Sequence, residues 1–390
     1  MLKRKNVNLT PGVLALPSTP GFGNGFKLIM DKATKNLIES VLSLPTMTFN
    51  ETAVSTFIKW YAAGLDLDVS EDMAGNVIVN YSGGSKSGIT FSAHMDHPGF
   101  EIIQAKGMDG TAALWGRVDV KFFSGSKVIV HTADGPCKAT IGKLLTGKSS
   151  NGKPCFQIKA KSEMSKGDFG HYDIPYIKFS DDRISALAAD NLMGVSSILE
   201  LMTRLVAKKA KVNVTGFFTR AEEAGFLGAF AAMESESVSK KNPLIVMECS
   251  SAPGGKVDIG GGPVIRSGDA QSSYNPEVEA WLIASANMVL KKNKKFKHQR
   301  ALLKGGRCEA CVYISEEYLV GGIALPLGNY HNHGPKSYAP EYISANDYSD
   351  MILLMEELAK SPMPKDFLKS KVDPIWKNYH KLKKKLIESK

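Results

Sequence analysis

Residues 88–100 of the chain read GITFSAHMDHPGF, and the character of the sequence changes within this stretch. Its first half is a short, mainly apolar run that ends at His94, which is typical of a buried strand. Its second half opens a region, from about 100 to 180, in which short β-like runs alternate with turn residues. The stretch therefore predicts a strand of a larger sheet that leads into a small β domain.

Helical and strand-like segments alternate on both sides of that β region. Before it, apolar residues spaced by three and four predict helices over 27–44 and 50–63, and a strand follows at 76–80. After residue 181, the expected strands are 212–219, 244–248 and 321–327, and the expected helices are 192–206, 276–291 and 345–360, with another beginning at 226.

This alternation predicts the α/β class, with a mixed, largely parallel central sheet covered by helices and an inserted small β-barrel-like domain. A chain of 390 residues is long enough for two domains, or for one large domain that carries an insertion. We expect residues 1–99 and 181–390 to form the α/β domain, and residues 100–180 to form the inserted β domain.

The composition narrows the class of protein. The chain has 49 Lys and Arg residues, 39 Asp and Glu residues and a net charge of +10, concentrated in residues 291–300 and at the C-terminal end. No nucleic-acid-binding motif accompanies this charge, so a solvated basic face is favoured over an acidic partner such as nucleic acid. No apolar run reaches the roughly 18 residues that cross a bilayer, and the N-terminal residues make a poor signal peptide. Because five scattered cysteines are typical of reduced thiols, we expect a cytoplasmic protein without nucleic-acid or membrane partners.

The C-terminal segment 374–390 is predicted to be one basic amphipathic helix. Ile375, Tyr379, Leu382 and Leu386 form a single apolar stripe on it. Packing of this stripe against the body of the protein is the favoured interpretation, and a contact with a partner or with another subunit is the alternative.

Six acidic and histidine side chains stand out by their position. Nearly all of them lie just past the carboxyl end of a predicted strand, which is the edge where ligands bind in open α/β sheets. Each also has an ordinary structural explanation, such as a helix cap, a salt bridge or a loop position. Taken together, two histidines, three acidic ligands and one spare carboxylate suit a pair of divalent ions bridged by one aspartate. The residues are His94, Asp190, Glu222, Glu223, Glu248 and His331.

Asp96 follows His94 by two residues, and side chains two apart in a strand point to the same side. A metal-bound histidine usually donates its second ring N–H to a carboxylate. Asp96 is therefore a candidate to orient His94, although a cap of the following turn explains its position equally well.

Four segments give these positions a family context: AHMDHPGF at 93–100, DNLMGVSSILELM at 190–202, EEAGFLGA at 222–229 and PLGNYH at 326–331. In order and in content they resemble the glutamyl-aminopeptidase and tetrahedral-aminopeptidase family of co-catalytic, two-metal metallopeptidases. Each segment alone has low specificity, whereas the ordered set is a strong signal. The resemblance implies a metal-dependent aminopeptidase that releases N-terminal residues from peptides.

The resemblance also implies roles for single residues. The implied metal ligands are His94, Asp190, Glu223, Glu248 and His331, with Asp190 as the bridge. Asp96 would orient His94, and Glu222 would be the general base for a water shared by two divalent metals. Zinc is the expected metal, with cobalt and manganese as alternatives. The α/β domain would be catalytic, the inserted domain would act as a lid or in oligomerisation, and the chain would form a homo-oligomer, which in this family is often a tetrahedral dodecamer.

The chain departs from the family pattern at several positions. Glu248 stands where aspartate is more usual, His97 where glutamate is expected, and Glu309 where a threonine-aspartate pair is expected. His333 lies two residues past His331 and is a rival for that ligand position. Two other functions therefore stay open: another two-metal amide hydrolase, such as a carboxypeptidase or deacylase, and a non-catalytic scaffold that keeps the fold.

Residues 142–149, GKLLTGKS, match the pattern of a phosphate-binding loop. Such a loop needs a helix directly after it, whose N-terminus holds the phosphate. Here a Gly/Pro turn and another strand-like run follow instead. We therefore do not expect nucleotide binding.

Overall fold

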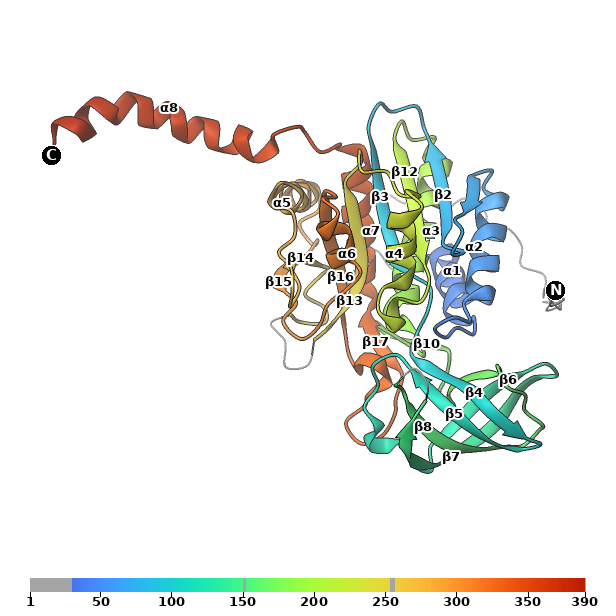
Figure 1. Cartoon of the computed structure of the whole chain (residues 1–390). Helices are drawn as coiled ribbons and strands as arrows, with labels where there is room; N and C mark the ends of the chain where they lie inside the picture. Colours follow the sequence, from blue (N-terminus) through green and yellow to red (C-terminus); the bar gives the residue numbers. More distant parts are fainter. Residues whose placement is uncertain (1–29, 150–151, 253–256, 390) are drawn as a thin grey trace.

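The computed structural model describes residues 30–149, 152–252 and 257–389, and it contains a central sheet with helices on both faces and a barrel at one end (Figure 1). The strands of the sheet lie in the order β1 (Asp68–Glu71), β2 (Val77–Ser82), β12 (Asn213–Thr219), β3 (Gly88–His94), β13 (Leu244–Ser251), β16 (Val320–Leu327), β14 (Val264–Gly268) and β15 (Gln299–Leu302). Four neighbours, β12, β3, β13 and β16, are parallel to one another. Their carboxyl ends therefore meet at one edge.

Helices cover both faces because the central strands are apolar on both sides. In β12, the adjacent side chains of Phe217 and Phe218 point to opposite faces and belong to different clusters of the core. One cluster includes α1 (Lys32–Leu42), α2 (Thr52–Gly64), α3 (Ala189–Lys208), α5 (Pro276–Lys292) and α7 (Ala345–Lys360). The other includes α4 (Leu227–Glu234) and α6 (Ala310–Ser315).

A closed six-stranded barrel follows β3 and has a core of its own, built around Phe100, Phe123 and Phe156. Its strands, in order around the barrel, are β4 (Gly99–Lys106), β5 (Asp109–Trp115), β8 (Pro154–Ala160), β7 (Gly135–Lys148), β6 (Lys127–Thr132) and β9 (Phe169–Tyr172). A further small sheet consists of β10 (Ile177–Ser180), β11 (Arg183–Ala186) and β17 (Glu341–Ser344).

The predicted fold class is confirmed. The sheet is mixed with a parallel centre, helices cover it, and a closed β-barrel is inserted in the chain after β3. The prediction missed β1, β14, β15, α6 and two strands of the three-stranded sheet, β11 and β17. Each of these elements has six residues or fewer, which is too short for periodicity to be recognised. β15 also begins inside the basic stretch 291–300, where the charged residues leave no apolar pattern from which a strand could be recognised.

The phosphate-loop pattern at 142–149 lies in a β-hairpin. β7 extends to Lys148, and β8, which begins at Pro154, pairs with it antiparallel. Residues 150–151 lie outside the described part of the chain. Among the described residues between these strands no helix begins, so the element that holds phosphate in such loops is missing there, as expected.

The C-terminal helix corrects one expectation. α8 (Phe367–Glu388) extends away from the rest of the chain (Figure 1), and residues 369–389 are all exposed. The preferred interpretation, that this helix packs against the body, is therefore wrong. Periodicity predicts an apolar face but not what covers it. None of the described helices combines the length and the apolar character needed to span a bilayer.

Glu356 of α7 joins this helix to α3, and its replacement is expected to destabilise the protein. Its carboxylate accepts from Lys208 (2.7 Å), Lys360 (2.9 Å) and Arg204 (3.2 Å). Burial raises the pKa of Glu356, but Lys208 and Lys360 outweigh it and lower the pKa to about 2. The stabilisation is therefore complete above the usual carboxyl pKa and is lost as the pH falls toward 2.

We expect Glu356→Gln to lower the free energy of unfolding by about 2–3 kcal/mol near neutral pH. Urea unfolding at about pH 7 and about pH 3 measures the effect, and the difference from wild type should narrow at the lower pH. Glu39→Gln, on the exposed face of α1, is the matched control. A difference that is unchanged at low pH would contradict an electrostatic origin.

Candidate metal centre

The carboxyl ends of the four parallel strands bring the candidate side chains to one edge of the sheet. His94 ends β3, Glu222 and Glu223 begin η2 (Glu222–Ala224) after β12, Glu248 lies in β13, and His331 lies in η3 (Tyr330–Asn332) after β16. Because these strands are neighbours in the sheet, residues far apart in the sequence become neighbours in space.

Asp190 enters from another direction, at the start of α3, where its backbone and that of Asn191 are not helical. Gly194 permits a close approach of α3 to the sheet. A Cβ at this position would lie 2.4 Å from Oδ1 of Asn191 and 3.0 Å from Cβ of Ala93 in β3. The close packing places Asp190 beside the end of β3, with its Oδ1 3.4 Å from Nε2 of His94.

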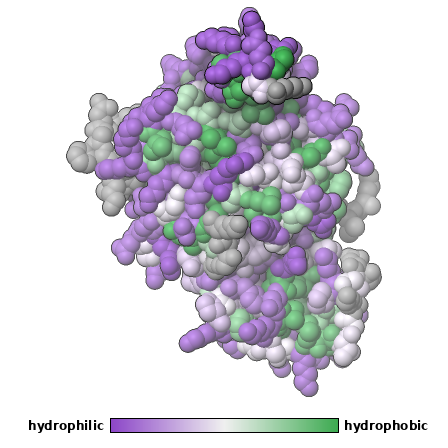
Figure 2. Space-filling model, turned by 90° about the vertical axis from the view of Figure 1, so that its left-hand side faces the viewer, coloured by the Kyte–Doolittle hydropathy of each residue, from purple (hydrophilic) through white to green (hydrophobic). Residues whose placement is uncertain are grey.

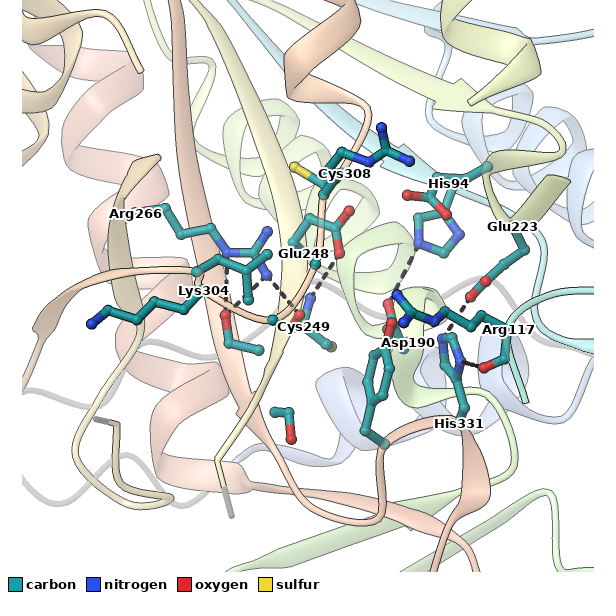
Figure 3. A pocket seen from close by; sticks show the side chains of 18 of the residues that line it. His94, Arg117, Asp190, Glu223, Glu248, Cys249, Arg266, Lys304, Cys308 and His331 are labelled. Carbon is teal, nitrogen blue, oxygen red and sulfur yellow. Dashed lines mark hydrogen bonds and ion pairs between the residues drawn. The ribbon is translucent and has the colours of Figure 1, made fainter. Parts of the chain in front are cut away.

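Two sets of side chains are arranged as metal ligands, and they share Asp190. His94, Asp190 and Glu248 form one set, and Asp190, Glu223 and His331 form the other. Within each set the donor atoms lie within 4.8 Å of one another. Figure 3 shows the four partners of Asp190 pointing toward the space around it.

Two of the potential ligand atoms in these sets lack hydrogen-bond partners, as expected for atoms that bind a cation. Oδ1 of Asp190 and Nε2 of His331 are buried and have none, although Nε2 of His331 lies only 2.9 Å from Oε1 of Glu223. Nδ1 donates to a backbone carbonyl at 2.7 Å in His331 and at 3.1 Å in His94. Nε2 of each ring is then free to coordinate, and imidazole with carboxylate suits borderline divalent ions.

Asp96 connects β3 to the turn that carries the two glutamates. Its carboxylate accepts the backbone N–H groups of Glu222 (2.9 Å) and Glu223 (3.1 Å), and the hydroxyl of Thr48 (3.0 Å). The same carboxylate lies 3.5 Å from Nδ1 of His94, whose hydrogen bond goes to the backbone carbonyl of Asp96. Asp96 therefore orients His94 through its backbone and the glutamates through its side chain.

Glu341, which the sequence did not reveal, ties together two loops that carry ligands. Its buried carboxylate accepts the backbone N–H groups of Asp190 (2.9 Å) and His331 (2.7 Å). His331 has a positive φ of 52°, and this hydrogen bond helps to hold that left-handed conformation. Every residue except proline has a backbone N–H, so no pattern of side chains marks the role of Glu341.

The site concentrates negative charge in a buried space. Burial, and then the carboxylates of Glu223 and Glu248, raise the pKa of Glu222 well above its usual range, against the opposing effect of a histidine. Burial and Asp190 raise the pKa of Glu248 to about 7. Burial would lower the pKa of His331, but Glu223 and Asp190 raise it to about 9. Bound cations would relieve the repulsion among these carboxylates.

The family model of the M42 glutamyl aminopeptidases matches residues 75–353, which include the barrel and every candidate ligand. The chain belongs to this family. It is accordingly a peptide hydrolase. No curated protein matches the chain by sequence.

Solved structures share the M42 fold at low sequence identity. The TET aminopeptidase of a marine sediment archaeon of the Thaumarchaeota is 19% identical with a TM-score of 0.72, and the match covers 86% of this chain and 99% of that chain. An aminopeptidase from the archaeon Desulfurococcus kamchatkensis is 22% identical with a TM-score of 0.71, covering 85% and 96%. The TET1 peptidase of Pyrococcus horikoshii is 22% identical with a TM-score of 0.67, covering 84% and 99%.

Three further side chains, which depart from the family pattern in the sequence, lie outside the two ligand sets. They are His97, His333 and Glu309. The ring nitrogens of His97 contact the backbone carbonyl of Asp190 (2.6 Å) and the side chain of Asn332 (3.1 Å). His333 bonds to a backbone carbonyl at the exposed rim. Glu309 is buried and accepts hydroxyl groups of β3 and β12.

A cavity of about 1010 Å³ opens over both ligand sets of this M42 peptidase. Beyond the ligands, four basic side chains line it: Arg117, Arg266, Lys304 and Arg307. Arg266 is buried, its Nη2 donates to the carbonyl of Cys249 (2.7 Å), and its Nη1 has no hydrogen-bond partner (Figure 3). These residues did not stand out in the sequence because they lie on a barrel loop, a short strand and an irregular loop.

Proposed function

We propose that this chain is a metal-dependent aminopeptidase that hydrolyses N-terminal residues from peptides. The observation that carries the proposal is the pair of ligand sets that share Asp190, in a cavity that is also lined by Glu222. Membership of the M42 glutamyl aminopeptidase family supports it.

In this proposal His94, Asp190 and Glu248 hold one divalent metal, and Asp190, Glu223 and His331 hold the second. Zinc suits these ligands, and cobalt and manganese are the alternatives. Two such cations supply the Lewis-acid chemistry that polarises a scissile carbonyl and acidifies a water.

Glu222 is the proposed general base. It belongs to neither ligand set, lines the same cavity and is held at its backbone N–H by Asp96. Burial raises its pKa, so its carboxylate has more affinity for a proton than an exposed glutamate has. Such a group can take a proton from water and pass it to the leaving amine.

The basic side chains of the cavity favour substrates with an acidic N-terminal residue. Five carboxylates line the cavity, and two divalent cations together with the four basic side chains exceed their charge. The exposed side chains of Lys304 and Arg307 are available to a substrate carboxylate, and the buried Arg266 adds positive charge to the wall of the cavity. This preference also agrees with the family description, glutamyl aminopeptidase.

A panel of peptides tests the proposal. We expect hydrolysis of peptides with a free N-terminus, none with an acetylated N-terminus, and loss of activity with a chelator that added zinc, cobalt or manganese reverses. A peptide with N-terminal Glu should be cleaved faster than its Leu counterpart, and Lys304→Glu should lower kcat/KM for the Glu peptide about tenfold. Lys294→Glu, in an exposed loop, is the matched control.

The panel also separates the alternatives. Cleavage of blocked peptides, or release of C-terminal residues, would favour a deacylase or a carboxypeptidase. A chain that binds metal but hydrolyses no peptide would be a scaffold. Faster cleavage of the Leu peptide would remove the acidic preference and leave the aminopeptidase proposal intact.

We also propose that the chain forms a homo-oligomer in the cytoplasm. Among its structural neighbours, one forms a dodecamer in its crystal, and the Pyrococcus horikoshii peptidase assembles into a tetrahedron or an octahedral shell. The barrel is the part of the chain proposed to act as a lid or in these contacts. The five cysteines are all free, which suits a reducing compartment.

A further inference from the structure

α8 carries an apolar face that no other described part of the chain covers. Ile375 and Leu386 are 66% and 63% exposed. At 3.6 residues per turn, the exposed apolar side chains lie on one arc of about 140°. They are Val372, Ile375, Trp376, Tyr379, Leu382, Leu386 and Ile387. An apolar surface of this extent, exposed on one helix, marks a contact site.

Outside this arc, which also contains Lys383 and has Lys369 at its edge, α8 is strongly basic. The helix contains seven lysines against two acidic residues, Asp373 and Glu388, a net charge of +5. In Figure 2, α8 points toward the viewer at the top of the molecule and presents both hydrophobic and hydrophilic side chains. The lysines are Lys369, Lys371, Lys377, Lys381, Lys383, Lys384 and Lys385.

The start of α8 is held against the body of the protein, whereas the rest of the helix is exposed. Phe367 is buried, and the backbone N–H of Leu368 donates to the carboxylate of Glu277 in α5 (2.7 Å). From residue 369 onward every described side chain of the helix is exposed, and the helix projects beyond the other elements (Figure 1). A flat surface can therefore contact the helix along its axis.

We propose that α8 binds the surface of an anionic phospholipid membrane and lies in the plane of the interface. A helix with a wide apolar arc, a lysine-rich polar face and aromatic residues has the composition of an interfacial anchor. Trp376 and Tyr379 suit the headgroup level, the aliphatic side chains enter the acyl boundary, and the lysines contact anionic headgroups. This contact is independent of the proposed hydrolytic function and would bring the active site to a membrane.

The positive charge of α8 argues against a second copy of this helix as the partner that covers its apolar face. Leu368, Val372, Ile375, Tyr379, Leu382 and Leu386 are spaced alternately by four and three, which resembles the seam of a coiled coil. The positions beside this seam hold Lys369, Lys371, Lys383 and Lys385 and no acidic residue, so paired copies would repel each other. Trp376 and Ile387 also widen the apolar arc beyond such a seam. Nucleic acid would use the lysines but leave the apolar arc in water.

Sedimentation with lipid vesicles tests the proposal on the full chain. We expect binding to vesicles of phosphatidylcholine mixed with an equal amount of phosphatidylserine, little binding to phosphatidylcholine alone, and weaker binding at high salt. Replacing Lys381, Lys384 and Lys385 together by Gln should lower the partition coefficient about a hundredfold, since each lysine near an anionic surface contributes about a factor of five.

The apolar arc is tested by Trp376→Ser combined with Leu382→Ser, which should weaken vesicle binding at least about tenfold. Asn378→Ser, on the polar side of the same helix, is the matched control and should bind as wild type. Hydrolysis of a small soluble peptide at the wild-type rate shows that each variant is folded, since α8 is remote from the cavity.

Three results would overturn the proposal. The first is failure of the wild-type chain to bind the anionic vesicles. The second is self-association, measured by light scattering, that the Trp376→Ser and Leu382→Ser pair abolishes while vesicle binding is unaffected. The third is binding to duplex RNA or DNA that the lysine variant loses, with vesicle binding unchanged in both variants.

Discussion

Glu222→Gln is expected to bind as much metal as the wild-type protein and to lose turnover by about 10²–10⁴-fold. The amide is similar in size to the carboxylate, but it cannot accept a proton from water. Glu222 is absent from both ligand sets, so its replacement leaves the donor atoms of the metals in place. Metal content by elemental analysis, together with kcat on a peptide with a free N-terminus, measures both parts of the result.

The control for this variant is Glu234→Gln, the same chemical change at an exposed position in α4. It should leave both metal content and kcat unchanged. Turnover by Glu222→Gln equal to that of the wild type would remove Glu222 from the role of base. A loss of metal along with turnover would instead make Glu222 a ligand.

The candidate ligands could be singled out in the sequence because the carboxyl ends of neighbouring parallel strands lie at one edge of the sheet. Each apolar run that ends in a histidine or an acid marks a carboxyl end, and neighbouring parallel strands bring these ends to one edge of the sheet. His94, Glu248 and His331 were found in this way. Asp190 was singled out with the segment 190–202, and the structure shows why a glycine stands at position 194 of this segment: a side chain there would collide with Asn191 and Ala93.

The groups that hold the ligands in position did not follow from the sequence. The carboxylate of Asp96 lies 3.5 Å from Nδ1 of His94, as the sequence suggested, but its hydrogen bonds to the backbone of Glu222 and Glu223 were not foreseen. Glu341 accepts two backbone N–H groups, and such a contact has no partner side chain that could reveal it. Local patterns predict where a strand ends, whereas these contacts depend on how separate loops meet.

The same distinction explains the outer parts of the molecule. The amphipathic period of α8 was visible in the sequence, because it depends only on residue spacing. Whether its apolar face meets the body depends on the path of residues 361–366, which have no regular pattern. Arg266, Lys304 and Arg307 line the cavity from short or irregular segments. The sequence therefore did not predict that these side chains lie in one cavity.

Asp190→Ala is expected to lose both metals and to lower turnover by at least about a thousandfold, equivalent to about 4 kcal/mol. Asp190 is the residue that belongs to both ligand sets, so its removal takes a donor from each. It also leaves the buried imidazoles of His94 and His331 without the carboxylate between them. Elemental analysis and kcat measure the result, and circular dichroism shows that the variant is folded.

The comparison that makes this prediction specific is His94→Ala. His94 belongs to one set, so this variant should keep the metal bound by Glu223 and His331 and lose the other. Asp134→Ala, at an exposed turn of the barrel, is the matched control and should keep both. Retention of one metal by Asp190→Ala would mean that the two sets do not depend on a shared aspartate.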